Sequence, residues 1–280
     1  MSAPVYFTRQ RLALLEQHLS ERDHLILVSL RRCKYLTTLQ IARLYCGGSV
    51  NRRAAVRAAN RCLTRLRELN LIRALQRRIG GVRAGSGSFV WTLTPGGFRL
   101  LQAGTADRQF RKQFREPTLR FLAHTLVISE AYLQLTEICA RHGMTLAAVQ
   151  FEPECWRQYS DRGGRQAVLK PDLYAVTRGD GYEDCWFIEI DCDTETVARV
   201  IEKCARYIHY LCSGTEQERT GVFPYVVWIV PDEKRKSSVT QHIRKEFPLD
   251  TLLFTVILPD ELEALIRKGA ENDRPTKTSD

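Results

Sequence analysis

The sequence predicts an α+β protein with two parts, the first built mainly from short helices and the second from alternating strands and helices. Apolar residues recur at helical spacing through much of residues 20–69, which is typical of packed amphipathic helices. After residue 118, strand-like runs alternate with helical patterns, and the apolar run 224–230 is typical of a strand buried on both faces. We therefore expect a mainly helical N-terminal domain and an α/β domain with a mixed central sheet.

Charge is distributed unevenly between the two parts. Residues 1–120 contain 23 Lys and Arg against 6 Asp and Glu, whereas residues 121–280 contain 19 against 26. Such a basic first part favours a polyanionic partner, and nucleic acid before a membrane surface. Composition and pattern together predict a first domain at 1–103, a polar linker at 104–117, a second domain at 118–268 and a polar tail at 269–280.

The cysteines and the absence of long apolar runs bear on where the protein works. Nine scattered cysteines with no CxxC pair indicate free thiols in a reducing compartment rather than a disulfide framework. No signal peptide and no apolar run long enough to cross a bilayer is visible. We expect a soluble, cytoplasmic protein with no membrane partner.

The first domain shows the pattern of a helix-turn-helix. Ser20 precedes a helix that extends to about Cys33, and Thr37 or Thr38 begins a second, shorter helix. A Gly-Gly-Ser turn at 47–49 leads into a long third helix from about Asn51 to Leu69. Two helices joined by a tight turn, the second one long and basic, are typical of helix-turn-helix DNA-binding proteins.

Arginines recur every four residues along the third helix. Arg53, Arg57, Arg61 and Arg65 follow one another along one side of it, and Arg52 adds charge at its start. A solvated surface usually mixes acids among its basic residues, and this face has none. We therefore expect the early arginines to contact base edges or phosphates and the later ones to follow the DNA backbone.

A basic β-ribbon is predicted after the third helix. Short strands at 71–75 and 89–93 flank a tip rich in Gly, Ser and Arg. Arg77, Arg78 and Arg83 lie in this ribbon, where we expect them to contact phosphates or a minor groove. Helices followed by such a ribbon predict a winged helix-turn-helix domain that binds double-stranded DNA.

Acidic residues gather at strand ends in the second domain. Asp172 begins a short apolar strand, a Gly-Asp-Gly turn follows at 179–181, and the next strand ends in Glu189 and Asp191. If the two strands form a hairpin, Asp172 falls near Glu189. Carboxylates converging inside an apolar frame suit Mg²⁺, so we expect Asp172 and Glu189 to ligate a metal.

The same stretch resembles the PD-(D/E)xK nuclease pattern, although Asp191 stands where the pattern usually has Lys. Lys203, on the helix expected to begin at Thr194 or Glu195, is well placed to substitute. Asp172, Glu189, Asp191 and Lys203, followed by Tyr207 and Tyr210, form a sequence pattern that is similar to the replication-relaxation family of plasmids and other mobile elements. The similarity covers roughly residues 20–258.

That resemblance implies a restriction-endonuclease-like second domain that nicks DNA with Mg²⁺ or Mn²⁺ at an origin during replication or transfer. Asp191 would be a further ligand or would orient the site, Lys203 would orient the attacking water, and Glu130 on the preceding helix would complete the ligand set. Tyr207 or Tyr210 as a nucleophile is a second enzymatic reading. The alternative is an inactive nuclease fold in a DNA-binding replication or transcription regulator. Besides DNA, the partners considered are a second copy of the chain, in a homodimer, and replication or conjugation proteins.

Overall fold

The computed structural model describes residues 7–48, 50–75, 89–102, 116–161, 163–179, 181–193 and 195–269. The chain divides into two compact units, Met1–Leu133 and Gln134–Asp280. Most of the predicted linker lies outside the described residues, so the domain boundaries given above remain predictions.

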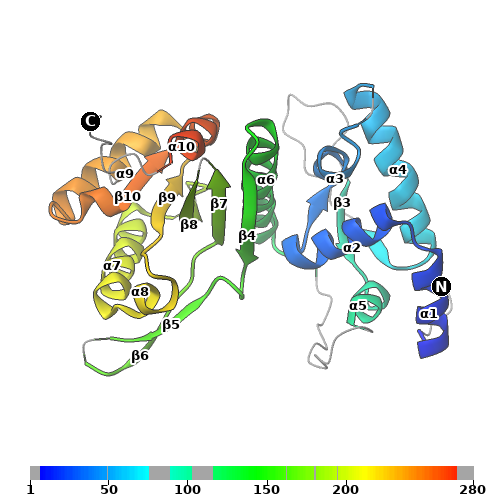
Figure 1. Ribbon diagram of the computed structural model, residues 1–280, viewed down its shortest axis with the longest axis horizontal. Helices are drawn as coiled ribbons and strands as arrows, with labels where there is room; N and C mark the ends of the chain where they lie inside the picture. The colour runs from blue at the N-terminus through cyan, green and yellow to red at the C-terminus, as the bar shows by residue number, and fades with distance from the viewer. Residues whose placement is uncertain are drawn as a thin grey trace. The chain divides into compact units, whose positions relative to one another are not determined.

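The first unit combines helices with a small antiparallel sheet (Figure 1). The sheet has the order β1-β3-β2, with both pairs antiparallel. The elements follow one another as α1 (Arg9–His18), α2 (Glu21–Cys33), β1 (Leu36–Thr37), α3 (Thr38–Tyr45), α4 (Arg52–Glu68), β2 (Ile72–Ala74), β3 (Val90–Leu93) and α5 (Pro95–Gln102).

Three helices of this unit begin at the capping residues that the sequence predicts. The Ser20 side chain and the Asp23 side chain each bond the other residue's backbone at the start of α2, which forms a capping box. Thr37 and Gln40 make the same arrangement at the start of α3. The Asn51 carboxamide oxygen accepts a hydrogen bond from the Ala54 amide, so α4 begins where the sequence predicts.

The Thr-Pro-Gly-Gly segment at the start of α5 makes a close backbone contact. The Thr94 hydroxyl donates to the Asn70 carbonyl and accepts from the Gly97 amide. A Cβ on Gly97 would lie 2.2 Å from the Leu71 carbonyl oxygen. Only glycine fits there, because any side chain would push α5 away from the segment that leads into β2.

The second unit is built on a mixed five-stranded sheet (Figure 1). Its order is β10-β9-β8-β7-β4, parallel from β10 to β8 and antiparallel from β8 to β4. The strands are β4 (Thr145–Phe151), β7 (Leu173–Gly179), β8 (Tyr182–Ile190), β9 (Tyr225–Ile229) and β10 (Phe254–Ile257), with a separate hairpin of β5 (Arg157–Ser160) and β6 (Gln166–Leu169).

The second unit also contains helices that follow its strands along the chain. They are α7 (Val197–Ser213), α8 (Thr215–Thr220), α9 (Glu233–Glu246) and α10 (Leu262–Lys268), with short 3-10 turns at Thr251–Leu253 and Pro259–Glu261. Side chains of α7 and α9 pack with Phe187 and Trp228 of the sheet in one apolar core. The long helix α6 (Leu119–Arg141) begins in the first unit and ends in the second. The α+β class with a mixed central sheet is confirmed.

Two local predictions needed correction in this unit. The polar segment 157–166 predicts the tip of a hairpin; a hairpin does form there, but 157–160 and residue 166 belong to its paired strands β5 and β6. The helix predicted from Thr194 or Glu195 begins at Val197 after Thr196. In contrast, the hairpin around Gly179–Gly181 forms as predicted, since β7 and β8 pair from Gly179 opposite Tyr182 to Leu173 opposite Ile188.

Candidate functional site

Helix α4 presents a basic outer face and an apolar inner face. Its inner face is buried and consists of Ala58, Ala59, Cys62, Leu63 and Leu66. The predicted DNA-binding residues Arg52, Arg53, Arg57 and Arg61 are all exposed. Among the described residues, none of these four side chains makes an ion pair, so their charge is directed toward solvent.

A fifth arginine of α4 has a different role. Arg65 forms an ion pair with Asp23, which is fully buried at the start of α2. Burial acts to raise the pKa of Asp23, but the hydrogen bonds from Arg65 and Ser20 outweigh it, so this pKa lies below its usual range. The pair attaches α4 to the start of α2 and holds the exposed face of α4 in a defined orientation.

The remaining predicted DNA contacts, Arg77, Arg78 and Arg83, lie outside the described residues. Their roles stay predictions.

The second candidate site lies where β7 begins and β8 ends. Because Leu173 pairs with Ile188, the antiparallel register brings Asp172 beside Glu189. Asp172 Oδ2 accepts a 2.8 Å hydrogen bond from the Ile190 amide, which fixes the carboxylate against the end of β8. The sequence-based pairing of these two acids is thus reproduced in the fold.

Glu189 is fully buried and both of its oxygens have donors. Lys203 of α7 donates to Oε2, and the Tyr207 hydroxyl donates to Oε1 at 2.5 Å. Burial raises the pKa of Glu189 to about 8, although Lys203 acts to lower it. Burial also disfavours the charged form of Lys203, but the carboxylates of Glu189 and Asp172 outweigh this and raise the pKa of Lys203.

The fold therefore brings together three of the five predicted catalytic residues, Asp172, Glu189 and Lys203, with Tyr207 beside them. Tyr207 is fully buried, and burial followed by the neighbouring Glu189 raises its pKa well above the usual value. A neutral, fully buried phenol that donates to a carboxylate is suited to positioning that carboxylate.

Asp191 takes part in a separate contact at the end of β8. Its Oδ2 accepts from Arg235 Nε of α9 at 2.6 Å, and its Oδ1 accepts from the Asp193 amide at 2.8 Å. Arg235 also donates to the Glu195 carbonyl. These bonds join the loop after β8 to the start of α9.

Glu130 bonds side chains of the first unit. Its carboxylate pairs with Arg43 and accepts from Gln40, both on α3. Gln40 also donates to the Leu126 carbonyl. These contacts attach the first half of α6 to α3, and no bond links Glu130 to Asp172 or Glu189 among the described residues.

A buried ionic network that the sequence did not reveal surrounds Glu216 of α8. Glu216 is fully buried and accepts from Arg157 of β5 at 3.2 Å, from the Tyr210 hydroxyl and from Arg219. Burial, followed by the hydrogen bond to Glu216, raises the pKa of Tyr210. The tyrosine therefore serves to hold this network and is poorly placed to become a phenolate nucleophile.

A sequence comparison completes this description. The family model described as replication-relaxation matches residues 27–226. The chain belongs to the replication-relaxation family. This membership indicates a role in replication or relaxation of mobile elements. No curated protein and no solved structure matches the chain.

The donors of this replication-relaxation protein can be tested against the Mg²⁺ predicted from its sequence. Both oxygens of Glu189 already accept from protein donors, and Asp172 accepts from a backbone amide. Among the described residues, no group of three or more His, Cys, Asp or Glu side chains could hold a metal ion. Magnesium prefers an octahedron of oxygens and water, so this closed arrangement does not fit the ion.

A membrane location finds no support in the helices. Within the ranges that the structure describes, no helix combines the length and apolar character needed to cross a bilayer.

Proposed function

We propose that this replication-relaxation protein binds double-stranded DNA of a mobile element through the exposed face of α4, and that its first unit is a winged helix-turn-helix domain. The observation that carries the proposal is the row of exposed arginines, Arg53, Arg57 and Arg61, without ionic partners among the described residues. Exposed arginines without acidic partners on a helix attract phosphates and are suited to bidentate contacts with guanine.

The way α4 is held supports the same role. A recognition helix must keep its orientation in the groove, and Asp23 fixes α4 through Arg65, which lies one turn beyond Arg61 on the same helix. Asn51 caps its first turn, whose backbone amides then favour a nearby phosphate. We expect Arg52 and Arg53 to contact base edges or phosphates, and Arg57 and Arg61 to contact the backbone.

Binding of a 30-base-pair duplex, followed by fluorescence anisotropy, tests this proposal. Replacing Arg53 and Arg57 together by Gln should weaken binding at least about tenfold, since each arginine contact contributes about 1 kcal/mol or more. Arg206→Gln is the matched control, because Arg206 is also an exposed helical arginine, and its partner is Glu202 in the second unit. Equal losses in both variants, or no binding by the native protein, would contradict the proposal.

A second candidate function is metal-dependent nicking of DNA by a nuclease-like second unit. The observation that favours it is the convergence of Asp172, Glu189 and Lys203 at one end of the sheet. The engagement of both Glu189 oxygens counts against it. The inactive alternative therefore has the stronger support: in it the cluster stabilises the fold, and the protein acts in the cytoplasm as a DNA-binding replication or regulatory factor.

Supercoiled plasmid separates these alternatives. Nicking in Mg²⁺ or Mn²⁺ that is absent in chelator, and lost in both Asp172→Asn and Glu189→Gln, would establish the enzyme. Glu183→Gln, on the exposed part of β8, is the matched control. Circular dichroism and duplex binding must stay native in all variants, because Glu189 is buried. The absence of nicking with every metal tested would leave the DNA-binding role alone.

A further inference from the structure

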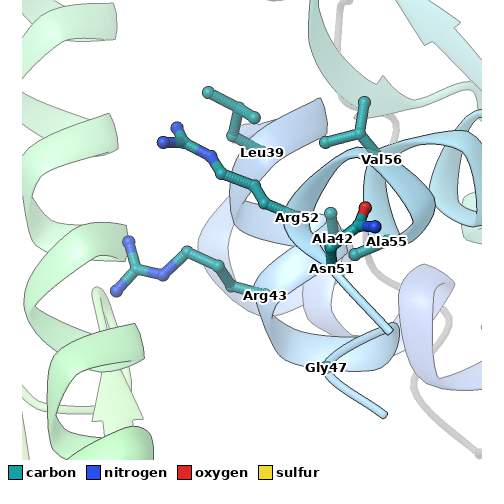
Figure 2. Close-up of a pocket in the computed structure, with 8 residues that line it drawn as sticks. All are labelled: Leu39, Ala42, Arg43, Gly47, Asn51, Arg52, Ala55 and Val56. Carbon is teal, nitrogen blue, oxygen red and sulfur yellow. The ribbon is translucent and has the colours of Figure 1, made fainter. Parts of the chain in front are cut away.

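A hollow opens at the start of α4 in the first unit. It has a volume of about 230 Å³. It lies between α3 and the first turn of α4, and Figure 2 shows the side chains around it. The lining residues are Leu39, Ala42, Arg43, Gly47, Asn51, Arg52, Ala55 and Val56.

The lining divides into an apolar floor and a basic rim. Leu39 and Ala42 contribute from α3, and Ala55 and Val56 from α4. Arg43 and Arg52 extend in the same direction at the rim, and Arg43 also pairs with Glu130 (Figure 2). The described residues that line the hollow include no carboxylate, so an apolar group attached to a polyanion matches it in both shape and charge.

The place of the hollow relates it to base recognition. The N-terminal residues of a recognition helix reach base edges in the major groove, and the first turn of α4 forms one wall here. Val50, just before that turn, is 98% exposed and adds a further apolar side chain at the same end of α4. In the major groove, the apolar feature that DNA presents is the 5-methyl group of thymine.

We propose that this hollow receives the 5-methyl group of a pyrimidine in the major groove while Arg52 binds an adjacent base edge or phosphate. The inference rests on the proposed DNA binding through α4 and adds the chemical feature that α4 reads. Burial of a methyl group against Leu39 and Val56 favours thymine over uracil, and 5-methylcytosine over cytosine, by the same physical effect.

Duplexes that differ only in the methyl group test the proposal directly. The native protein is titrated with a 24-base-pair duplex of alternating dA and dT and with the same duplex in which uracil replaces every thymine. Binding should be about fourfold weaker for each methyl group removed from the hollow. A second pair, G·C duplexes with cytosine or 5-methylcytosine, shows whether the hollow accepts a methyl group from either base.

A protein variant locates the effect. Val56→Thr keeps the side-chain shape and replaces one methyl group with a hydroxyl. A methyl group cannot form a hydrogen bond with this hydroxyl, so covering the hydroxyl with the base costs free energy. The preference for thymine over uracil should fall below about twofold, while binding to both duplexes persists through the arginines. Val127→Thr is the matched control, because Val127 is a partly exposed helical valine of α6 in the same unit.

The outcomes separate the two proposals. If the native protein binds neither duplex, the proposed DNA binding fails and the inference fails with it. If it binds both duplexes with equal affinity, or if Val56→Thr keeps the full preference for thymine, the methyl site is wrong and DNA binding through α4 stands.

Discussion

Arg53, Arg57 and Arg61 extend from an open face of α4, whereas Glu189 and Glu216 in the second unit are completely buried and accept bonds from two or three donors each. Charges in water interact weakly with their neighbours and remain available to a ligand. Buried charges need a full set of partners, because removing one leaves an uncompensated ion.

The comparison shows which ions are suited to binding and which to structure. α4 contains both kinds, since Arg65 has a buried partner and its neighbours in the row do not. In the second unit, the predicted metal ligands Asp172 and Glu189 are buried groups that already accept bonds from the protein. The charges of α4 are therefore the better candidates for contact with an external partner.

The largest effect is expected at Glu216. Glu216→Ala leaves Arg157 buried without its carboxylate, so the free energy of unfolding of the second unit should fall by about 3–5 kcal/mol. Urea denaturation measures this loss. The matched control, Glu202→Ala, removes an exposed partner of Arg206 and should change it by less than about 0.5 kcal/mol. Similar losses would mean that burial does not distinguish the two ion pairs.

The next effect is a pH dependence from Glu189. Its pKa in the folded protein, about 8, lies above the usual value, so the folded state holds a proton that the unfolded state releases. Stability should therefore decrease as pH rises from about 5 to 8, by at most about 1.4 kcal/mol per pH unit. Thermal melts of the native protein and Glu189→Gln check this. A profile that is unchanged in the variant would assign the dependence to another group.

Asp23→Asn should have a smaller effect on the free energy of unfolding. The contribution of Asp23 to stability depends on pH in the opposite direction to that of Glu189. The pKa of Asp23 is lowered in the folded state, so its contribution is present at neutral pH and is lost as pH falls below about 4. We expect about 1–2 kcal/mol less stability at pH 7 and weaker duplex binding, because α4 loses its attachment. Unaltered DNA affinity in a destabilised variant would show that Arg65 does not orient the recognition face.

The smallest effect is expected at Glu130. Its pair with Arg43 is partly exposed, so Glu130→Gln should cost less than about 1 kcal/mol. Any nicking activity should also be unchanged, because Glu130 bonds Arg43 and Gln40 of α3 and does not belong to the acidic cluster of the sheet. A loss of nicking with native stability would instead restore Glu130 to the ligand set predicted from the sequence.

Much of this architecture could be predicted from local patterns in the sequence. The capped starts of α2, α3 and α4 and the hairpin that brings Asp172 to Glu189 depend on neighbouring residues, so they were predictable. The partners of Asp191 and Glu130 were not, because Arg235 and Arg43 are 44 and 87 residues away in the chain.

The network around Glu216 was missed for a related reason. The sequence predicts a loop from Ser213 to Gly221, whereas the structure has α8 there, and its Glu216 is buried and bonded to Arg157 of β5. A single polar segment does not show which of its charges is covered by distant residues.

The salt dependence of duplex binding tests the central claim most directly. Each phosphate contact of an arginine adds about 0.9 to the slope of log affinity against log salt concentration. Replacing Arg53, Arg57 and Arg61 together by Gln should therefore lower that slope by about 2–3, with the melting temperature unchanged because all three side chains are exposed. A slope equal to that of the native protein would contradict the account, since the exposed face of α4 would then not contact DNA.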